Sequence, residues 1–236
     1  MNIKAQVPNF ITLLNLFCGC IALVFTFLHN FEYAFYFVCL GIFLDFFDGF
    51  FARLFHVSGP LGLQLDSLAD MVTSGVVPGL ILFTLLSDSR DGIIFFEYLP
   101  YFGFVVTLGA CYRLANFNID ARQSDSFIGL PTPANALFLL SLPLIIIAND
   151  FPVITALLHN HWVLMGITVL SAYIMNAEIL LFSLKIKNFS FARYKLQIFF
   201  LSVSLFLLVF FKYLGIPLVI LTYILLSVMN NMLQKK

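Results

Sequence analysis

Residues 43 to 71, FLDFFDGFFARLFHVSGPLGLQLDSLADM, place acidic side chains inside a strongly apolar part of the chain. The stretch contains four aspartates within 26 residues: Asp45, Asp48, Asp66 and Asp70. Phe and Leu surround them, as in a helix that is buried in a membrane. Carboxylates that lie close together repel one another, and hydrocarbon does not solvate them. The stretch therefore predicts a positively charged partner that binds between these side chains.

The composition of the whole chain is typical of a membrane protein. Of its 236 residues, 61% are hydrophobic, 10% are charged and 30 are Phe, whereas soluble domains have about a quarter charged residues. We therefore predict an all-α, polytopic transmembrane helical bundle that forms one integral-membrane domain over residues 1–236. The formal net charge is zero, and no basic patch is interleaved with aromatics, so nucleic acid is not an expected partner.

Apolar runs of about 20 residues, the length that crosses a bilayer, recur along the chain and predict about eight spans. The last two runs are separated only by Gly215 and Pro217. This separation is either a tight reversal or a break in one helix, and seven spans is the alternative count. The predicted spans are 8–28, 32–53, 66–86, 94–115, 132–149, 160–183, 196–212 and 214–232.

The distribution of basic residues predicts the orientation of these spans, because cytoplasmic loops are rich in Lys and Arg. If the N-terminus is cytoplasmic, ten basic residues lie on the inner side: Lys4, Arg53, Arg113, Arg122, Lys185, Lys187, Arg193, Lys195, Lys235 and Lys236. Two lie on the outer side: Arg90 and Lys212. We therefore expect a multi-pass protein of the inner (cytoplasmic) cell membrane, with both termini and the acidic stretch at the cytoplasmic side of spans two and three.

The spacing of the aspartates predicts a metal site. Asp45 and Asp48 are three residues apart, and Asp66 and Asp70 are four apart, so each pair lies on one face of a helix. Each charge at bilayer depth costs about 2.5–3.5 kcal/mol, so four together cost about 10 kcal/mol before their repulsion is added. Divalent cations offset this cost, and an all-carboxylate site suits Mg²⁺ or Mn²⁺ better than zinc. We expect one ion or two.

The residues around the aspartates suggest that the site also binds phosphate. The small residues Gly49, Ala52 and Gly62 allow a ligand to approach the acidic faces. Arg53 offers a forked donor that matches phosphate oxygens. One arginine cannot neutralise four carboxylates, so simple ion pairing does not explain the cluster. A divalent-cation transporter remains an alternative, although a pure cation pathway has little use for the arginine.

At this point the stretch resembles a known family, the CDP-alcohol phosphotransferases. Its pattern is Asp45-x2-Asp48-Gly49-x2-Ala52-Arg53-x8-Gly62-x3-Asp66-x3-Asp70, and it matches the family signature at every defined position. The resemblance implies a membrane-embedded enzyme that transfers a phosphoalcohol group from a CDP-linked donor to an acceptor hydroxyl and releases CMP. The family also suggests a homodimer.

The resemblance implies roles for individual residues. Asp45, Asp48 and Asp66 would ligate a first metal ion, and Asp45, Asp66 and Asp70 a second. Asp70 would also accept the proton of the acceptor hydroxyl. The residues expected around the CDP-lipid are Gly49, Ala52, Arg53, Ser58, Gly62, Thr12 and Asn15. For Thr12 and Asn15, hydrogen bonding between packed helices is the alternative role.

Two further stretches bear on the acceptor. The N-terminal pattern Pro8-Asn9-x2-Thr12-x2-Asn15 and the stretch YRLANFNIDARQSDSFIGLPTPANA, residues 112–136, look like the phosphatidylserine synthases of this family. The implied substrates are CDP-diacylglycerol and L-serine, within a membrane of other lipids.

Serine is a zwitterion, so its carboxylate needs a cation. The residues expected to bind it are Arg113, Asn116 and Asn118, with Arg122 as a further cation. In this family a second arginine often occupies the place of Asn116. Glycerol 3-phosphate or an inositol phosphate is the alternative acceptor, and an arginine that sets topology is the alternative role of Arg113. Glu178, within span six, has no assigned role.

Overall fold

Helices make up most of the chain in the computed structural model, which describes residues 3–57, 59–89, 97–120, 127–182 and 195–234. The long helices are α1 (Ile3–Phe27), α2 (Phe31–Leu54), α4 (Val77–Asp88), α5 (Val105–Phe117), α6 (Thr132–Ala148), α8 (His161–Asn176), α9 (Lys195–Phe211) and α10 (Gly215–Gln234). The shorter elements are α3 (Pro60–Asp70), the π-helical turn η1 (Met71–Val76), the 3₁₀ turns η3 (Leu99–Phe104) and η5 (Lys212–Leu214), α7 (Pro152–Leu158) and the strands β1 (Phe127–Ile128) and β2 (Leu180–Leu181).

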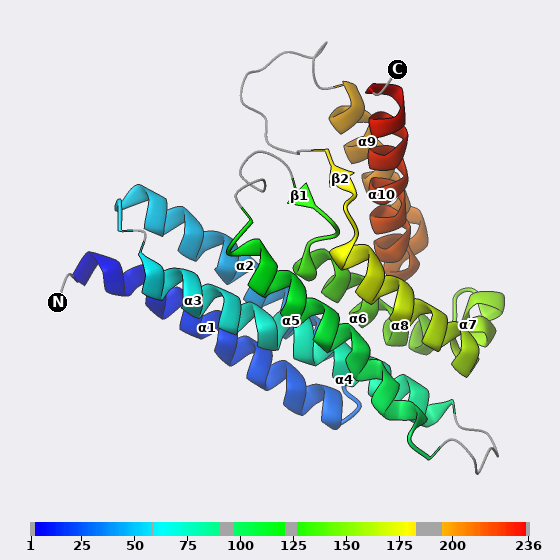
Figure 1. The fold of residues 1–236 in the computed structure, drawn as a ribbon. Coiled ribbons are helices and arrows are strands. Elements are labelled where there is room, and N and C mark those ends of the chain that lie inside the picture. The colour runs from blue at the N-terminus through cyan, green and yellow to red at the C-terminus, as the bar shows by residue number, and fades with distance from the viewer. Residues whose placement is uncertain (1–2, 58, 90–96, 121–126, 183–194, 235–236) are drawn as a thin grey trace.

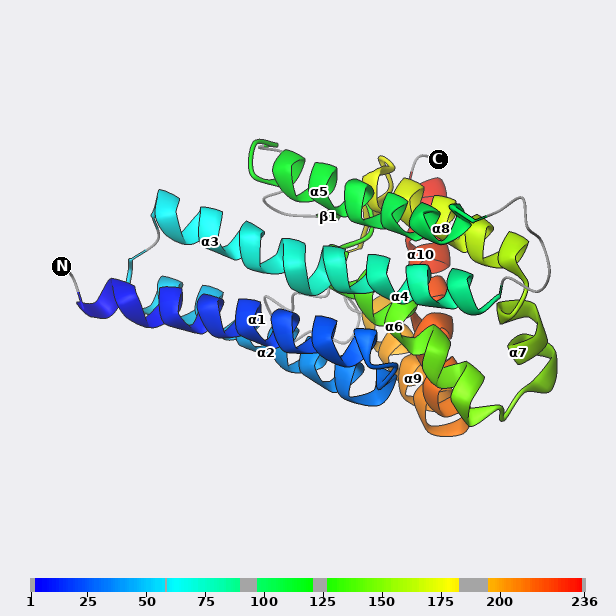
Figure 2. The ribbon, with the colours of Figure 1, turned by 90° about the horizontal axis from the view of Figure 1, so that it is seen from below.

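The first five helices form the part of the fold that contains the acidic stretch. α1 and α2 are an antiparallel hairpin, and the chain reverses at His29, which has a positive φ of 56°. α3, η1 and α4 follow one another without a break and lie alongside α1, with α5 on their other side (Figures 1 and 2). Pro60 starts α3, at a position where its missing N–H costs no helix hydrogen bond. This arrangement brings the predicted spans two and three together.

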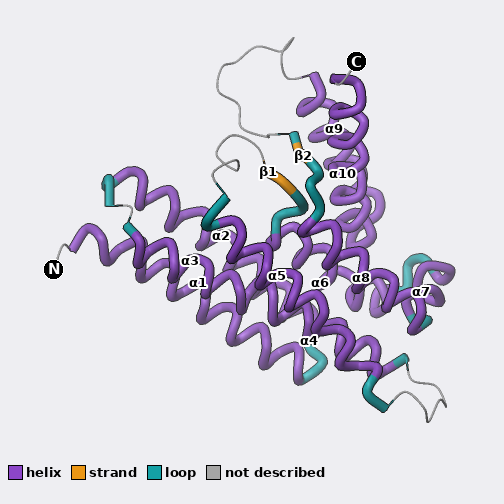
Figure 3. Tube along the Cα trace, in the orientation of Figure 1, coloured by secondary structure: helices purple, strands orange, loops and turns teal. Residues whose placement is uncertain are grey.

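The remaining helices complete the fold at one end of this group. α7 and α8 meet at an angle of 78°. α9 and α10 pack against each other and stand across the direction of α1 and α2, as the views in Figures 1 and 2 show. The tube in Figure 3 shows that the reversal between them, at η5, is short. α6 packs against both α2 and α10 and so joins the two parts.

Four helices in the described part of the chain are long and apolar enough to cross a membrane, and a fifth is added if the bent pair α7–α8 counts as one span. They cover Gln6–Phe27, Phe31–Leu54, Pro60–Asp88 and Lys195–Leu233. The last of these folds back on itself at η5, close to the boundary that Gly215 and Pro217 predict. A helical membrane protein is thus confirmed, whereas the count of eight spans and the cytoplasmic termini stay predictions.

Some helix boundaries differ from the sequence expectation. The predicted span six runs to residue 183, but α8 ends at Asn176 and the next residue, Ala177, has an extended backbone. β2 then pairs with β1 as a short antiparallel ladder, Phe127 with Leu181 and Ile128 with Leu180. The apolar residues in this segment are compatible with a helix or with a strand. A strand of two residues is too short to show a periodic pattern in the sequence. The third helical segment also starts earlier than expected, at Pro60.

The core is centred on α4 and α6. The side chains of Ile81, Leu82 and Leu86 on α4, and of Leu139 and Leu140 on α6, are almost completely buried. Most large apolar side chains on α9, by contrast, are exposed, as a helix that faces lipid requires. Because α3 continues into the buried α4, the acidic residues on α3 are anchored to the centre of the molecule.

Candidate active site

The carboxylates of α2 and α3 meet as the sequence predicts. Asp45 and Asp48 come from α2 and Asp66 from α3, and one carboxylate oxygen of each lies within 4.8 Å of the others. Asp48 is 6% exposed. Oδ1 of Asp45 is buried and has no hydrogen-bond partner among the described residues. A buried carboxylate oxygen without a donor is unfavourable, so this geometry favours a bound cation.

Asp70 lies one helical turn after Asp66 and joins the cluster. It interacts electrostatically with Asp45 and Asp66, and its Oδ1 accepts a hydrogen bond of 3.2 Å from Nδ2 of Asn15 on α1. The hydroxyl of Thr73 donates to Oδ1 of Asn15 at 2.9 Å. This bond leaves the Asn15 amide nitrogen free to face Asp70. Asn15 therefore orients Asp70 and does not line the pocket described below.

The residues present fit a divalent metal ion. All the ligand atoms are carboxylate oxygens, the type that Mg²⁺ and Mn²⁺ prefer. Opposite ligands of Mg²⁺ lie about 4 Å apart, twice the usual bond length, so three oxygens within 4.8 Å of one another need little movement to surround an ion. Cys and His, which zinc prefers, are absent from this group of described residues.

Thr12 connects α1 to the cluster on the other side. Its hydroxyl lies 2.5 Å from Oδ2 of Asp48 and 3.1 Å from the carbonyl oxygen of Pro8. A hydroxyl has one proton to donate, and the shorter distance favours the carboxylate. The bond fixes the orientation of the Asp48 carboxylate.

A pocket of about 180 Å³ opens beside Asp48 and Asp66. Four of the residues predicted to contact the CDP-lipid line it: Thr12, Gly49, Ala52 and Gly62. Arg53 is exposed, and its guanidinium lies 3.4 Å from the point that a Cβ on Gly49 would occupy. The pocket therefore combines small residues, an adjacent cation and the acidic cluster. Ser58, the remaining predicted contact, lies outside the described residues.

Asn9 also lines this pocket, although the sequence does not single it out as a binding residue. Its Oδ1 lies 3.4 Å from the position of a Cβ on Gly62. The available signal is its spacing, three residues before Thr12, which places it on the same face of the helix.

A π-helical turn follows Asp70 directly. Residues Met71–Val76 form η1, and the carbonyl oxygen of Gly75 accepts a hydrogen bond of 2.9 Å from the Thr107 hydroxyl on α5. π-helical turns inside α-helices are rare and are frequently found at functional sites. This one changes the direction of the side chains between Asp70 and α4.

The residues predicted to bind the acceptor separate into two groups. Asn118 donates from Nδ2 to the hydroxyl of Ser67, which adjoins Asp66, at 2.8 Å. Arg113 is 6% exposed and donates to the carbonyl oxygens of Leu130 and Gly129 at 2.6 and 3.2 Å. Arg113 thus ties α5 to the loop before α6. Arg122 lies outside the described residues.

Arg113 and Asn116 line a second, mostly polar pocket of about 170 Å³. Its other polar residues are Tyr112, Asp120, Asn176 and Glu178. Glu178 thus lies at this pocket, a location that the sequence alone does not predict. None of the lining residues belongs to the acidic pocket.

We expect Gly41→Ala to disturb the support of Asp70. A Cβ at Gly41 would lie 2.7 Å from Oδ1 of Asn15 and 2.9 Å from Cγ2 of Thr73, so Asn15 must move. Overpacking of this kind costs about 1–3 kcal/mol, and turnover should fall because Asn15 no longer holds Asp70. Thermal unfolding and CMP release measure the two effects. Gly166→Ala, where a Cβ meets open space, is the control, and equal stability and turnover in both variants would contradict the prediction.

Comparison with known proteins agrees with this geometry. A family model described as CDP-alcohol phosphatidyltransferase matches residues 5–174. A protein of Bacillus subtilis is 36% identical over 131 residues, which cover 54% of this chain and 69% of that protein. One of Helicobacter pylori strain J99 is 29% identical over 209 residues, 87% of this chain and 81% of that protein.

A third relative, from Saccharomyces cerevisiae, is 33% identical over 153 residues, 58% of this chain and 53% of that protein. All three relatives are named CDP-diacylglycerol–serine O-phosphatidyltransferase. The family match covers well over half of the chain and includes the whole acidic cluster and the pocket beside it. The chain belongs to the CDP-alcohol phosphatidyltransferase family.

Proposed function

We propose that this protein transfers the phosphatidyl group of CDP-diacylglycerol to the hydroxyl of L-serine and releases CMP. The observation that supports this most is the carboxylate cluster of Asp45, Asp48 and Asp66, with Asp70 beside it, at the edge of a pocket that glycines keep open. The names of the relatives support serine as the acceptor. We place the reaction at the cytoplasmic side of the cell membrane, with all of residues 1–236 in one catalytic domain that acts as a homodimer.

The reaction requires a nucleophile to attack a phosphorus atom that already carries negative charge. Asp45, Asp48, Asp66 and Asp70 would hold Mg²⁺ or Mn²⁺, two ions in our proposal. Such ions supply stabilisation of the charge on the pyrophosphate and on the departing CMP. Gly49, Ala52 and Gly62 let the donor come close to the acids, and the Arg53 guanidinium and Ser58 would contact its phosphates.

We propose Asp70 as the general base. Asn15 donates a hydrogen bond to Oδ1 of Asp70 and so fixes the orientation of the carboxylate. The second carboxylate oxygen of Asp70 can then accept the proton of the serine hydroxyl. The serine oxygen then forms a bond to the phosphorus of the phosphatidyl group, and the bond from that phosphorus to the CMP oxygen breaks. The proton remains on Asp70 until it passes to solvent.

The test of this proposal is an acceptor screen. Purified protein in vesicles that contain CDP-diacylglycerol and Mn²⁺ is given serine, glycerol 3-phosphate, inositol or choline, and CMP release is measured. We expect release with serine and a labelled phospholipid when the serine is radioactive. Release with another acceptor, and none with serine, would overturn the substrate and leave the reaction class intact. Release with none of them would overturn the function.

Asn116→Ala tests the second polar pocket as the site of the acceptor. We propose that Arg113, Asn116 and Asn118 bind serine. Arg113 and Asn116 line this pocket, whereas Asn118 lies beside Ser67. The pocket suits a zwitterion because it combines a cation with the acids Asp120 and Glu178. The exposed Asn116 side chain can be removed without opening the core. Loss of one hydrogen bond to a charged group should raise the KM for serine about tenfold and leave the KM for CDP-diacylglycerol unchanged.

The matched control is Ile119→Ala, a change at a side chain that is 81% exposed just beyond the same helix. It should alter neither constant. An unchanged KM for serine in Asn116→Ala, or equal increases in both constants, would remove Asn116 from the acceptor site.

A further inference from the structure

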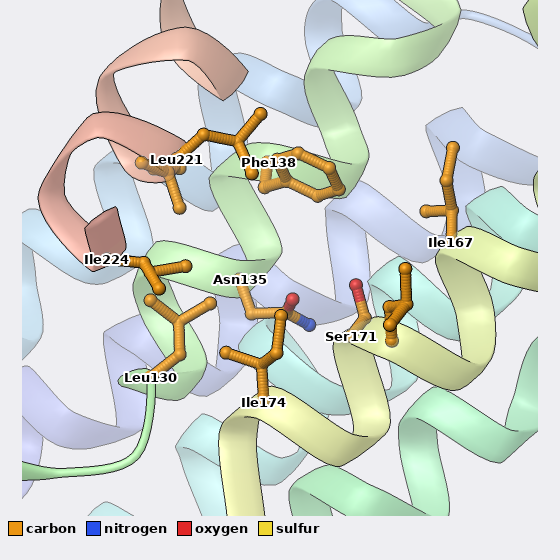
Figure 4. Close-up of a pocket in the computed structure, with 10 residues that line it drawn as sticks. Leu130, Asn135, Phe138, Ile167, Ser171, Ile174, Leu221 and Ile224 are labelled. Atoms are coloured by element: carbon orange, nitrogen blue, oxygen red, sulfur yellow. The ribbon is translucent and has the colours of Figure 1, made fainter. Parts of the chain in front are cut away.

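A third pocket lies away from the acidic cluster, between α6, α8 and α10 (Figure 4). It has a volume of about 100 Å³, and its lining includes Phe138, Ile174 and Ile224. None of its lining residues contributes to the pocket beside the aspartates. The reaction proposed above gives this space no role.

One polar side chain in this pocket lacks partners. Asn135, in the first turn of α6, is 1% exposed, and neither its amide nitrogen nor its amide oxygen has a hydrogen-bond partner among the described residues. Figure 4 shows the amide directed into the space between the helices, with Ser171 of α8 near it. Buried polar groups in native proteins are nearly always hydrogen-bonded. Asn135 therefore indicates a ligand that offers both a donor and an acceptor.

The surroundings restrict the ligand to one with an apolar body. Apart from Asn135 and Ser171, the lining consists of apolar side chains, and it includes no charged residue. Leu170 and Leu221 at its edge are 58% and 45% exposed, and in a membrane protein such exposed leucines face lipid. The pocket is thus open to the bilayer, and its occupant enters from there.

We propose that this pocket binds the carboxyl end of a long-chain fatty acid in its neutral form. The carboxyl O–H donates to Oδ1 of Asn135 and the carboxyl C=O accepts from Nδ2, so both unpartnered atoms are satisfied. The volume holds about three groups of the size of a water molecule, enough for the carboxyl group and the first methylenes. The rest of the chain extends past Leu170 and Leu221 into the bilayer. The apolar lining keeps the acid protonated.

A photoreactive fatty acid tests this. The full chain is placed in phosphatidylcholine vesicles with a fatty acid that carries a diazirine near its carboxyl end, and the labelled peptides are mapped by mass spectrometry. We expect labels on α6, α8 and α10 around the pocket. Excess oleic acid should remove them, whereas methyl oleate, which lacks the donor, should compete about tenfold less well. CDP-diacylglycerol should not compete.

Two variants on α10 provide the matched pair. Ile224→Trp fills the pocket and should lower labelling about fivefold, which corresponds to a loss of about 1 kcal/mol of binding free energy. Leu225→Trp, at a side chain that is 63% exposed beside it, should not. Asn135→Leu should make oleic acid and methyl oleate compete alike.

Four results would overturn the proposal. Equal competition by acid and ester in the wild type would exclude recognition by Asn135. Labelling that Ile224→Trp leaves unchanged would exclude this pocket as the binding site. Competition by CDP-diacylglycerol would assign the pocket to the substrate. Absence of label from these helices would assign the amide to ordered water.

Discussion

Asp70→Asn should lower kcat by about 10²–10⁴-fold, the contribution of a positioned general base. The asparagine is nearly isosteric, but its amide cannot accept the proton of the attacking hydroxyl. The KM for CDP-diacylglycerol should change little, because Asp70 is not among the residues that line the donor pocket. Affinity for Mn²⁺ should fall only moderately, because three carboxylates remain within 4.8 Å of one another.

CMP release at saturating substrates gives kcat, and titration with Mn²⁺ gives the metal affinity. Asp150→Asn is the control, because Asp150 forms an ion pair with Lys212 at 3.1 Å, away from the cluster, and the change in charge is the same. A kcat close to that of Asp150→Asn would remove Asp70 from the role of base. Metal-dependent flux across the vesicle, without CMP release in the wild-type protein, would favour a transporter instead.

Asp45→Asn should abolish activity and at the same time stabilise the metal-free protein. Activity should fall about 10³-fold or more, because a catalytic metal contributes several kcal/mol and each 1.4 kcal/mol is a factor of ten. The stabilisation has a separate cause. Two carboxylates 4 Å apart repel by about 4 kcal/mol at an effective dielectric constant of 20, and Asp45 has an oxygen without a donor. An asparagine there is uncharged and can donate to its neighbours.

Thermal unfolding with EDTA and then with Mn²⁺ separates these effects. In EDTA the variant should unfold at a higher temperature than the wild type, by about 2–4 °C for each kcal/mol of relieved repulsion. Mn²⁺ should raise the Tm of the wild type and not that of the variant. A wild-type Tm that does not respond to Mn²⁺, or a variant that is less stable in EDTA, would contradict the metal site. Asp150→Asn again serves as the control.

The meeting of the aspartates of α2 and α3 can be predicted from the sequence because the information for it is local. The spacings of three and four residues place each pair of aspartates on one helix face. Because the connection between the two apolar helices is short, these two faces lie close together. Asp45, Asp48 and Asp66 meet for this reason. The small residues Gly49 and Gly62 also line the adjacent pocket as expected.

Other features depend on contacts between distant segments and are not visible in local patterns. Asn15 bonds to Asp70, 55 residues away, and a polar stripe on one helix does not reveal which partner each side chain selects. Arg113 looks like a free cation in the sequence, yet it is bound to two carbonyl oxygens. The end of α8 at Asn176 depends on pairing with a strand that begins some 50 residues earlier.

The wide turn after Asp70 has a consequence for how this chain can vary in length. A π-helical turn corresponds to one residue inserted into an α-helix, and each residue of an α-helix advances by about 100°. Deletion of a single residue between Asp70 and Val77 would let the segment become regular α-helix. Because the wide turn already absorbs the extra residue, the acids of α3 would keep nearly the same orientation relative to the packed face of α4, whereas deletion of a residue within the regular helix α3 or α4 would rotate them by about 100°. Met71–Val76 is thus the place in this continuous helical segment where the chain can lose a residue without turning the acidic cluster away from the interior.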